Sequence, residues 1–171
     1  PRARLVCPQG ADAERLIAMA AGEYLARDLI NTPASDMGPA ELEQAARDLA
    51  TRHGARIETI RGEDLLARNF PMIHAVGRAG AQAPRLIDLR FPGSGPQVTL
   101  VGKGVCFDTG GLDIKPPSSM LLMKKDMGGA ATAMGLAEII MSLGLDIRLR
   151  LLVPAVENAI SAAAMRPGDI L

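Results

Sequence analysis

Aromatic residues are scarce in this sequence, which has one Tyr, three Phe and no Trp among its 171 residues. Proteins that bind single-stranded nucleic acids stack bases on aromatic side chains, so this composition argues against a stacking platform. Basic and acidic side chains are equal in number, 19 of each, and the net charge is zero. A balanced chain carries no electrostatic footprint for nucleic acid or for an anionic membrane. We therefore expect neither as a partner.

Cysteine and histidine are also rare, with two residues of each. Cys7 and Cys106 are far apart, and His53 and His74 are isolated, so the usual spacing of a zinc site is missing. No apolar run approaches the length of about 20 residues that a membrane-spanning helix needs. The first ten residues, PRARLVCPQG, lack the apolar core of a signal peptide. These absences predict a cytoplasmic protein with reduced thiols.

The composition that is present is typical of a globular protein, with 48% apolar and 22% charged residues. A chain of this length is sufficient for one domain with a buried core.

Helical patterns recur along the chain. In the first of them, apolar residues at helical spacing place Leu16, Ala20 and Tyr24 on one face. The second begins with a proline in its first turn and ends before a glycine, as helices commonly do. We expect helices at residues 11–30, 39–53, 62–69 and 127–144.

Extended patterns separate these helices. Strands are expected at residues 55–60, 84–91, 97–102 and 146–158, the second and third joined by the turn PGSGP. Alternation of strands and helices favours an α/β fold with a mainly parallel or mixed sheet flanked by helices. In such sheets, ligands bind beyond the carboxyl ends of the strands.

The most unusual stretch follows the strand at 97–102 and is expected to be a loop over residues 103–126. With its flanking residues (102–131), this stretch reads GKGVCFDTGG and then LDIKPPSSMLLMKKDMGGAA. Its charged residues stand among glycines and apolar residues, where an unpaired charge is costly to bury. Two carboxylates brought together repel each other unless a cation lies between them, and oxygen ligands suit Mg, Mn or Zn. The residues concerned are Lys103, Asp108, Lys115 and Asp126.

Each of these residues also has a simpler interpretation. Asp126 precedes a predicted helix, where aspartate is a favoured N-cap, and Asp108 precedes a glycine turn. Lysines are most often solvated surface charges. In the sharper interpretation, burial near a metal removes the proton from one lysine, which becomes a ligand, while the other holds the oxygen of a polarised carbonyl.

The glycines of the stretch allow the backbone to pass close to a ligand. They are Gly102, Gly104, Gly110 and Gly111. A phosphate-binding loop is the alternative explanation, although the sequence matches neither the P-loop nor the dinucleotide-binding motif.

Residues 100–130, LVGKGVCFDTGGLDIKPPSSMLLMKKDMGGA, closely resemble the leucine aminopeptidases, which are cytosolic, hexameric, two-metal exopeptidases. The family signature comprises a GKG, an FDSGG or FDTGG, a lysine just beyond, and a DMGGAA. The resemblance extends to LINTPASDMGPAEL (29–42), VPAVEN (153–158) and RPGDI (166–170), and so spans nearly the whole chain.

The resemblance implies a role for five residues of this sequence. Lys103, Asp108 and Asp126 match metal ligands, with Asp108 bridging two ions. Lys115 matches the catalytic lysine, which polarises the substrate carbonyl. Met123 matches a methionine of the specificity pocket, although a methionine is also a common core residue. All five would line the substrate site.

One part of the family pattern is missing. The family completes its site with an NTDAEGR-type segment after RPGDI, which supplies an aspartate, a glutamate and an arginine that holds bicarbonate. This chain ends at Leu171, and the family's separate N-terminal domain is also missing. Residues 1–171 are therefore expected to be the N-terminal portion of the metallopeptidase catalytic domain, one domain incomplete at its C-terminus.

The resemblance implies that the parent protein is a homohexamer that uses two divalent ions, Zn or Mn, and possesses a bicarbonate site. It would release leucine-like residues from peptides with a free N-terminus, and this piece alone would be inactive. Two alternatives stay open. One is a phosphate- or nucleotide-binding module, and the other is a non-catalytic family member with a regulatory, DNA-binding role.

Overall fold

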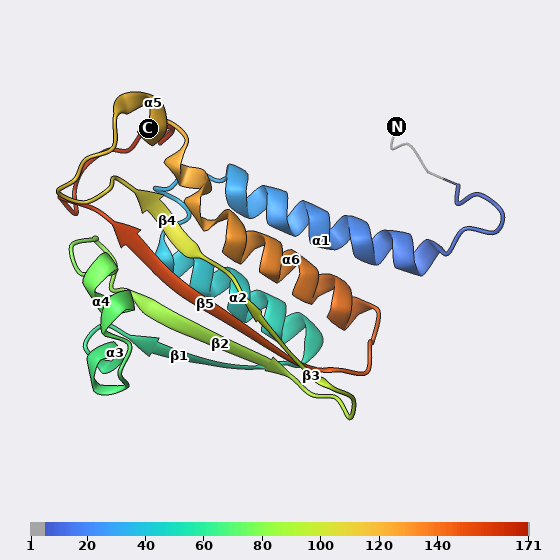
Figure 1. The fold of residues 1–171 in the computed structure, drawn as a ribbon. Coiled ribbons are helices and arrows are strands. Elements are labelled where there is room, and N and C mark those ends of the chain that lie inside the picture. Colours follow the sequence, from blue (N-terminus) through green and yellow to red (C-terminus); the bar gives the residue numbers. More distant parts are fainter. Residues whose placement is uncertain (1–5, 171) are drawn as a thin grey trace.

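A mixed five-stranded sheet forms the centre of the molecule in the computed structural model, which describes residues 6–170 (Figure 1). The long strand β5 pairs antiparallel with β2, which pairs antiparallel with β1. On its other edge, β5 pairs in parallel with β3 and, further along, with β4. The strands are β1 (Arg56–Arg61), β2 (Arg85–Phe91), β3 (Gln97–Val101), β4 (Gly104–Asp108) and β5 (Arg148–Asn158). The predicted α/β fold with a mixed sheet is therefore confirmed.

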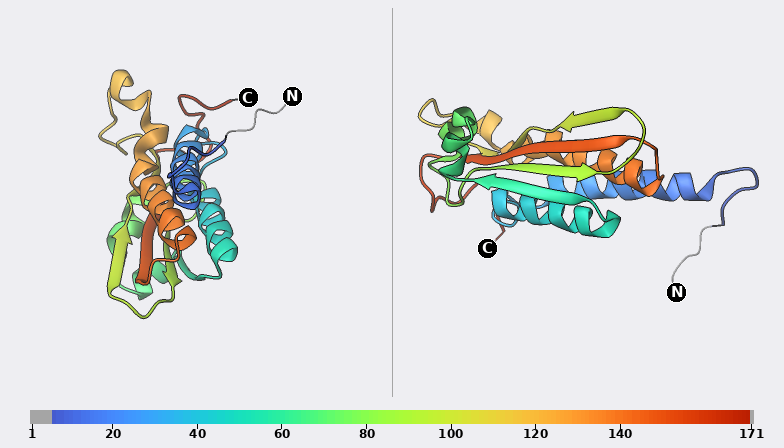
Figure 2. Two further views of the ribbon diagram at one scale, coloured as in Figure 1. Left: turned by 90° about the vertical axis from the view of Figure 1, so that its right-hand side faces the viewer. Right: turned by 90° about the horizontal axis from the view of Figure 1, so that it is seen from below.

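Helices cover this sheet unequally (Figure 2). Helices α2 and α6 pack on one face, and α1 lies outside them against α6. The short helices α3 and α4 cover one end of the opposite face and leave the rest of it open. The helices are α1 (Ala13–Asn31), α2 (Pro39–His53), α3 (Asp64–Ala67), α4 (Pro71–Gly77), α5 (Pro117–Met120) and α6 (Gly128–Ser142), with a 3-10 helix η1 (Met123–Met127). In residues 6–170, no helix has the length and apolar character needed to cross a bilayer.

The core lies between the sheet and helices α2 and α6. Alternate residues of β5 point into it, so that Leu149, Leu151 and Val153 are buried. Leu42 and Leu49 of α2 and Met134 of α6 meet them from the helical side. Full burial of each such side chain contributes about 1.5–3 kcal/mol to folding.

Helix α1 packs on α6 through small residues, which differs from the expected face. The buried residues of α1 are Ala18, Gly22 and Leu29, whereas Leu16 and Tyr24 are 52% and 63% exposed. A Cβ atom on Gly22 would lie 2.4 Å from the carbonyl oxygen of Gly135 in α6. The backbones cross so closely that larger residues are excluded from the contact, and the predicted apolar face is wrong for this reason.

The prediction of a single loop over residues 103–126 is wrong. These residues contain strand β4, helix α5 and most of η1. Helix α4 was also not expected. By contrast, helix α2 has the predicted bounds, and Gly54 ends it in a left-handed conformation with φ of 66°.

Candidate metal and substrate site

Asp108 is the last residue of β4, and its two carboxylate oxygens have different partners. Oδ1 accepts hydrogen bonds from the backbone N–H of Gly110 and from Nδ2 of Asn158, each at 2.8 Å. Oδ2 lies 3.4 Å from Nζ of Lys115. Burial opposes ionisation, but these donors together hold the pKa of Asp108 below its usual value. Asp108 is therefore a fixed, ionised carboxylate.

Lys103 and Asp126 form a second ion pair. Nζ of Lys103 donates to both carboxylate oxygens of Asp126 at 2.7 Å. Lys103 directly precedes β4 and its side chain is 59% exposed, whereas that of Asp126 is only 14% exposed. The backbone N–H of Ala130 donates to the carbonyl oxygen of Lys103 at 2.8 Å, which fixes the start of α6 beside β4.

The structure tests the simpler interpretation of each aspartate. Asp126 is not an N-cap, because it lies within η1 and the residue before α6 is Met127, which makes no side-chain cap. Its carboxylate faces Lys103 instead. Asp108 does stabilise the glycine turn through Gly110, but its second oxygen is directed to Lys115.

The glycines near the site pass close to the chain's own atoms. A Cβ atom on Gly102 would lie 2.5 Å from Cα of Ala130, and one on Gly110 would lie 2.2 Å from the carbonyl oxygen of Asp113. The N–H groups of Gly110 and Gly111 donate to the side chains of Asp108 and Thr109. These N–H groups are therefore committed within the turn, which argues against a phosphate-binding loop.

The predicted site residues are brought together as two pairs. Lys103 and Asp126 lie at the start of β4, and Asp108 and Lys115 lie at its end. The pairing of β4 with β5 is irregular between Val105 and Asp108, as at the bulges that redirect side chains near functional sites. Within residues 6–170, no three His, Cys, Asp or Glu side chains form a metal-binding group.

Asn158 was not identified from the sequence. It is the last residue of β5 and lies opposite Asp108 in the parallel pairing. Its carbonyl oxygen accepts hydrogen bonds from the backbone N–H of Thr109 at 3.0 Å and from its hydroxyl at 2.8 Å. The available signal was its position at the end of VPAVEN, because the carboxyl ends of parallel strands lie side by side.

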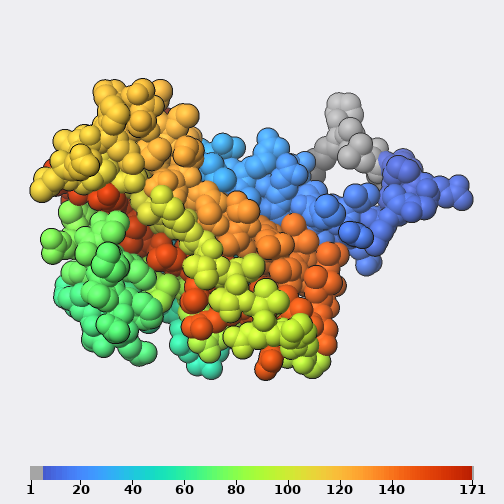
Figure 3. Space-filling view, viewed as in Figure 1, coloured from blue at the N-terminus to red at the C-terminus, as the bar shows by residue number. Residues whose placement is uncertain are grey.

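The segment that carries most of these residues, 109–125, projects from one end of the molecule (Figure 3, yellow to orange). It exposes several large apolar side chains, namely Leu112, Ile114, Leu121 and Leu122. A cavity of about 210 Å³ lies beneath it, lined by Phe107, Ile114, Met120 and Met165 among others. Met123, the predicted specificity residue, lies in η1 and is partly buried, and it does not line this cavity.

Comparison with known proteins supports the sequence resemblance. The model of the cytosol aminopeptidase family, catalytic domain, matches residues 24–171. This chain belongs to the cytosol aminopeptidase family. The predicted membership of this family is therefore confirmed.

Individual relatives agree with this assignment. A protein of Geobacter sp. (strain M21) named "Probable cytosol aminopeptidase" is 41% identical over 162 residues, which cover 93% of this chain and 33% of the relative. The crystal structure of the cytosol aminopeptidase from Coxiella burnetii is 59% identical, with a TM-score of 0.83 over 91% of this chain and 34% of that one. The bottromycin maturation enzyme BotP in complex with Mn is 38% identical, with a TM-score of 0.81 over 93% of this chain and 36% of that one. The chain thus spans about a third of the length of the relatives it matches.

Proposed function

We propose that this chain is the first part of the catalytic domain of a metal-dependent aminopeptidase, which releases leucine-like residues from the N-termini of peptides. The observation that carries the proposal is the pair of carboxylates, Asp108 and Asp126, each held against a lysine within the matched catalytic domain. Solvated surface charges would not need this arrangement, because both carboxylates are largely buried.

The carboxylates in this part of the site are suited to binding a divalent cation. Each carboxylate already holds a cation, the ammonium group of a lysine, at 2.7 or 3.4 Å. Asp108, Asp126 and Lys103 would hold the metal, because carboxylate oxygens and a neutral amine are ligands that Mn and Zn accept. Lys103 would have to lose a proton to do so, and metal binding would then release that proton. The structure of the relative BotP in complex with Mn supports this choice of metal.

When bound, two divalent ions would activate a water molecule and polarise the scissile carbonyl. Lys115 would donate a hydrogen bond to the carbonyl oxygen and stabilise the negative charge that develops there. In the structure, its ammonium group is 3.4 Å from Asp108 and its side chain is 31% exposed, so it can reach a substrate. Asn158 and Gly110 would hold the Asp108 carboxylate in one orientation throughout. Met123 would contact the side chain of the N-terminal residue.

The remaining features of the proposal rest on family membership. Further ligands and a bicarbonate site would be supplied by a segment beyond this chain, and the parent protein would be a cytoplasmic homohexamer. The apolar side chains exposed on segment 109–125 support further polypeptide or substrate covering that surface.

The test is release of leucine from leucine p-nitroanilide by the longer protein that contains this chain. The enzyme would be stripped of metal by chelation and then supplied with Mn or Zn. We expect activity to depend on the added metal and to fall about 100-fold or more in Asp108→Asn and Asp126→Asn. Asp113→Asn is the matched control, because Asp113 is exposed in the same segment. The 171-residue chain should be inactive under all conditions.

Two results would contradict the proposal. If the longer protein releases no leucine with either metal, the phosphate-binding and regulatory alternatives would replace it. If Asp126→Asn is as active as Asp113→Asn, Asp126 is not part of the site.

A further inference from the structure

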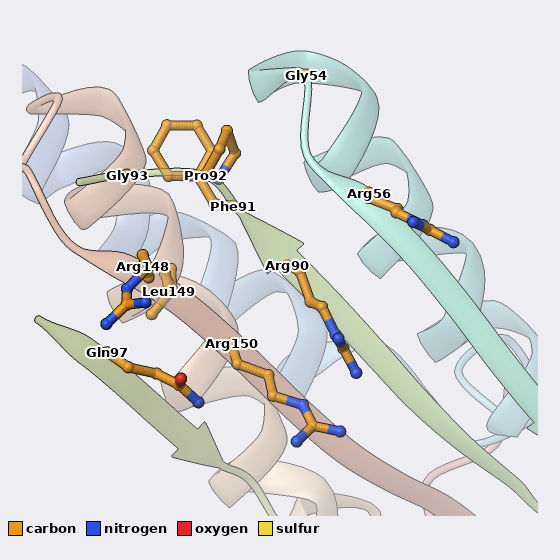
Figure 4. A pocket seen from close by; sticks show the side chains of 10 residues that line it. All are labelled: Gly54, Arg56, Arg90, Phe91, Pro92, Gly93, Gln97, Arg148, Leu149 and Arg150. Carbon is orange, nitrogen blue, oxygen red and sulfur yellow. The ribbon is translucent and has the colours of Figure 1, made fainter. Parts of the chain in front are cut away.

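A row of arginines crosses the open face of the sheet, remote from the helices α2 and α6 (Figure 4). Arg56 of β1 lies opposite Arg90 of β2, and Arg90 lies opposite Arg150 of β5. Arg148 lies two residues before Arg150 and therefore on the same face. Like charges directly opposite each other destabilise a sheet, so this row requires a compensating interaction.

The chain itself compensates the row only in part. Asp88 accepts hydrogen bonds from Nε and Nη2 of both Arg90 and Arg150, at 2.8–3.3 Å. Arg56 pairs with Glu58 at 2.6 Å. Arg148 forms no ion pair with residues 6–170 and donates to the carbonyl oxygen of Gly95 at 3.1 Å. Four guanidinium groups are thus matched by two carboxylates.

Asp88 also determines which donors remain available. It binds two neighbouring guanidinium groups side by side through their Nε and Nη2 atoms. Among the described residues, Nη1 of Arg90 and Nη1 of Arg150 have no hydrogen-bond partner, although each carries two N–H groups. Burial opposes ionisation of Asp88, but the hydrogen bonds from Arg150 and Arg90 keep its pKa low, so the carboxylate stays charged and keeps both side chains in place.

These arginines line an open hollow of about 550 Å³, which lies within the size range of small-molecule sites. The turn Phe91-Pro92-Gly93 closes one end, and Gln97 adds an amide beside Arg148 (Figure 4). Asp88 and Glu58 do not line this hollow. They line a neighbouring one, further along the same strands.

We propose that the hollow lined by Arg56, Arg90, Arg148 and Arg150, here termed the arginine site, binds a small ligand that carries two or more phosphate groups. Guanidinium groups bind phosphate oxygens through paired, charge-assisted hydrogen bonds, and several arranged together favour a multiply charged ligand. A long polyanion is disfavoured, because beyond the hollow it would meet the carboxylates of Asp88 and Glu58. The arginine site is independent of the proposed aminopeptidase activity.

The test is titration of the 171-residue chain with pyrophosphate by isothermal calorimetry, at low and at physiological salt. We expect saturable binding with one site per chain. Arg148→Gln and Arg150→Gln should each weaken binding about tenfold or more, because each removes a charge-assisted hydrogen bond. The matched control is Arg27→Gln, which makes the same charge change on exposed helix α1.

Circular dichroism would show whether each variant is folded. If Arg150→Gln does not fold, Arg148→Gln still tests the proposal, because Arg148 makes no hydrogen bond with Asp88. Three results would overturn the proposal. One is no binding of pyrophosphate at low salt. Another is equal weakening in Arg27→Gln, which would indicate a general charge effect. The third is binding of duplex DNA or heparin with no binding of pyrophosphate, which would indicate a surface for polymers.

Discussion

Asn158 donates a hydrogen bond from Nδ2 to Oδ1 of Asp108 at 2.8 Å, and so joins the carboxyl ends of two parallel strands. The two residues are 50 positions apart in the sequence. This contact leaves Oδ2 of Asp108 directed to Lys115. We propose that Asn158, together with the backbone N–H of Gly110, orients Asp108 for metal binding, as groups hydrogen-bonded to metal ligands commonly do.

We expect Asn158→Ala in the longer protein to weaken metal binding about 10- to 100-fold, because Asp108 would lose one of its two Oδ1 donors. The measurement is a titration of Mn²⁺ followed by calorimetry. The backbone contacts of residue 158 with Thr109 do not depend on its side chain and would persist. A fall in melting temperature with no change in Mn²⁺ affinity would mean that Asn158 has a purely structural role.

Lys115→Met should lower kcat strongly while the metal content changes little, because Lys115 is proposed to act on the substrate carbonyl. Steady-state kinetics and metal analysis of the longer protein would be compared. Lys125→Met is a suitable control, since Lys125 is exposed in the same region and has no assigned role. Parallel loss of metal and activity in Lys115→Met would show instead that Lys115 is a ligand or a structural residue.

Stability should depend on pH through Glu43 of α2, which is 2% exposed and bound by three arginines, Arg47, Arg61 and Arg85. Burial alone would raise its pKa, but the hydrogen bonds from Arg61, Arg47 and Arg85 outweigh it and lower the pKa from 4.5 to about 2. The folded-state pKa is therefore below the unfolded-state value. The stabilisation is present above pH 4.5 and is lost as the pH falls toward 2.

The pKa difference corresponds to about 3 kcal/mol of unfolding free energy at neutral pH. We expect Glu43→Gln to lose about this amount and to show a flatter pH dependence between pH 4.5 and 2. Urea unfolding of the 171-residue chain at several pH values measures both quantities. An equally steep pH dependence in the variant would show that other carboxylates account for acid sensitivity.

Gly135→Ala should destabilise the contact between α1 and α6, because the new Cβ atom would lie 2.5 Å from the carbonyl oxygen of Gly22. A backbone atom cannot move aside cheaply, so we expect a loss of about 1–3 kcal/mol. Gly128→Ala lies in the same helix, meets only ordinary contacts from 3.7 Å outward and should be neutral or slightly stabilising. Equal denaturation midpoints for the two variants would contradict the close crossing of the helices.

The sequence predicts an element best where its structure depends on residues that are adjacent in the sequence. Helix α2 was predicted with its observed bounds, because Pro39 and Gly54 mark its ends locally. Strand β4 was missed, because its five residues form a strand only by pairing with β5, about 50 positions later. The buried face of α1 was missed for a similar reason. It is determined by the approach of Gly135 to Gly22, which no periodicity within α1 reveals.

In the candidate site, too, residues of one continuous motif could be predicted, whereas residues that meet only in the folded chain could not. Lys103, Asp108, Lys115 and Asp126 were named from a continuous motif, and the structure adds how they pair. Asn158 was not named, since its role arises only when β4 and β5 lie side by side. The proposed arginine site could not be predicted from the sequence, because Arg56, Arg90 and Arg150 belong to three different strands and come together only in the sheet.

The central claim is that Asp108 and Asp126 are ligands of one metal centre. Anomalous X-ray diffraction at the manganese edge, from crystals of the longer protein grown with Mn²⁺, tests it most directly. The account predicts anomalous peaks about 2.0–2.2 Å from carboxylate oxygens of both residues. Full manganese occupancy elsewhere, with the Lys103–Asp126 and Lys115–Asp108 pairs intact, would contradict it.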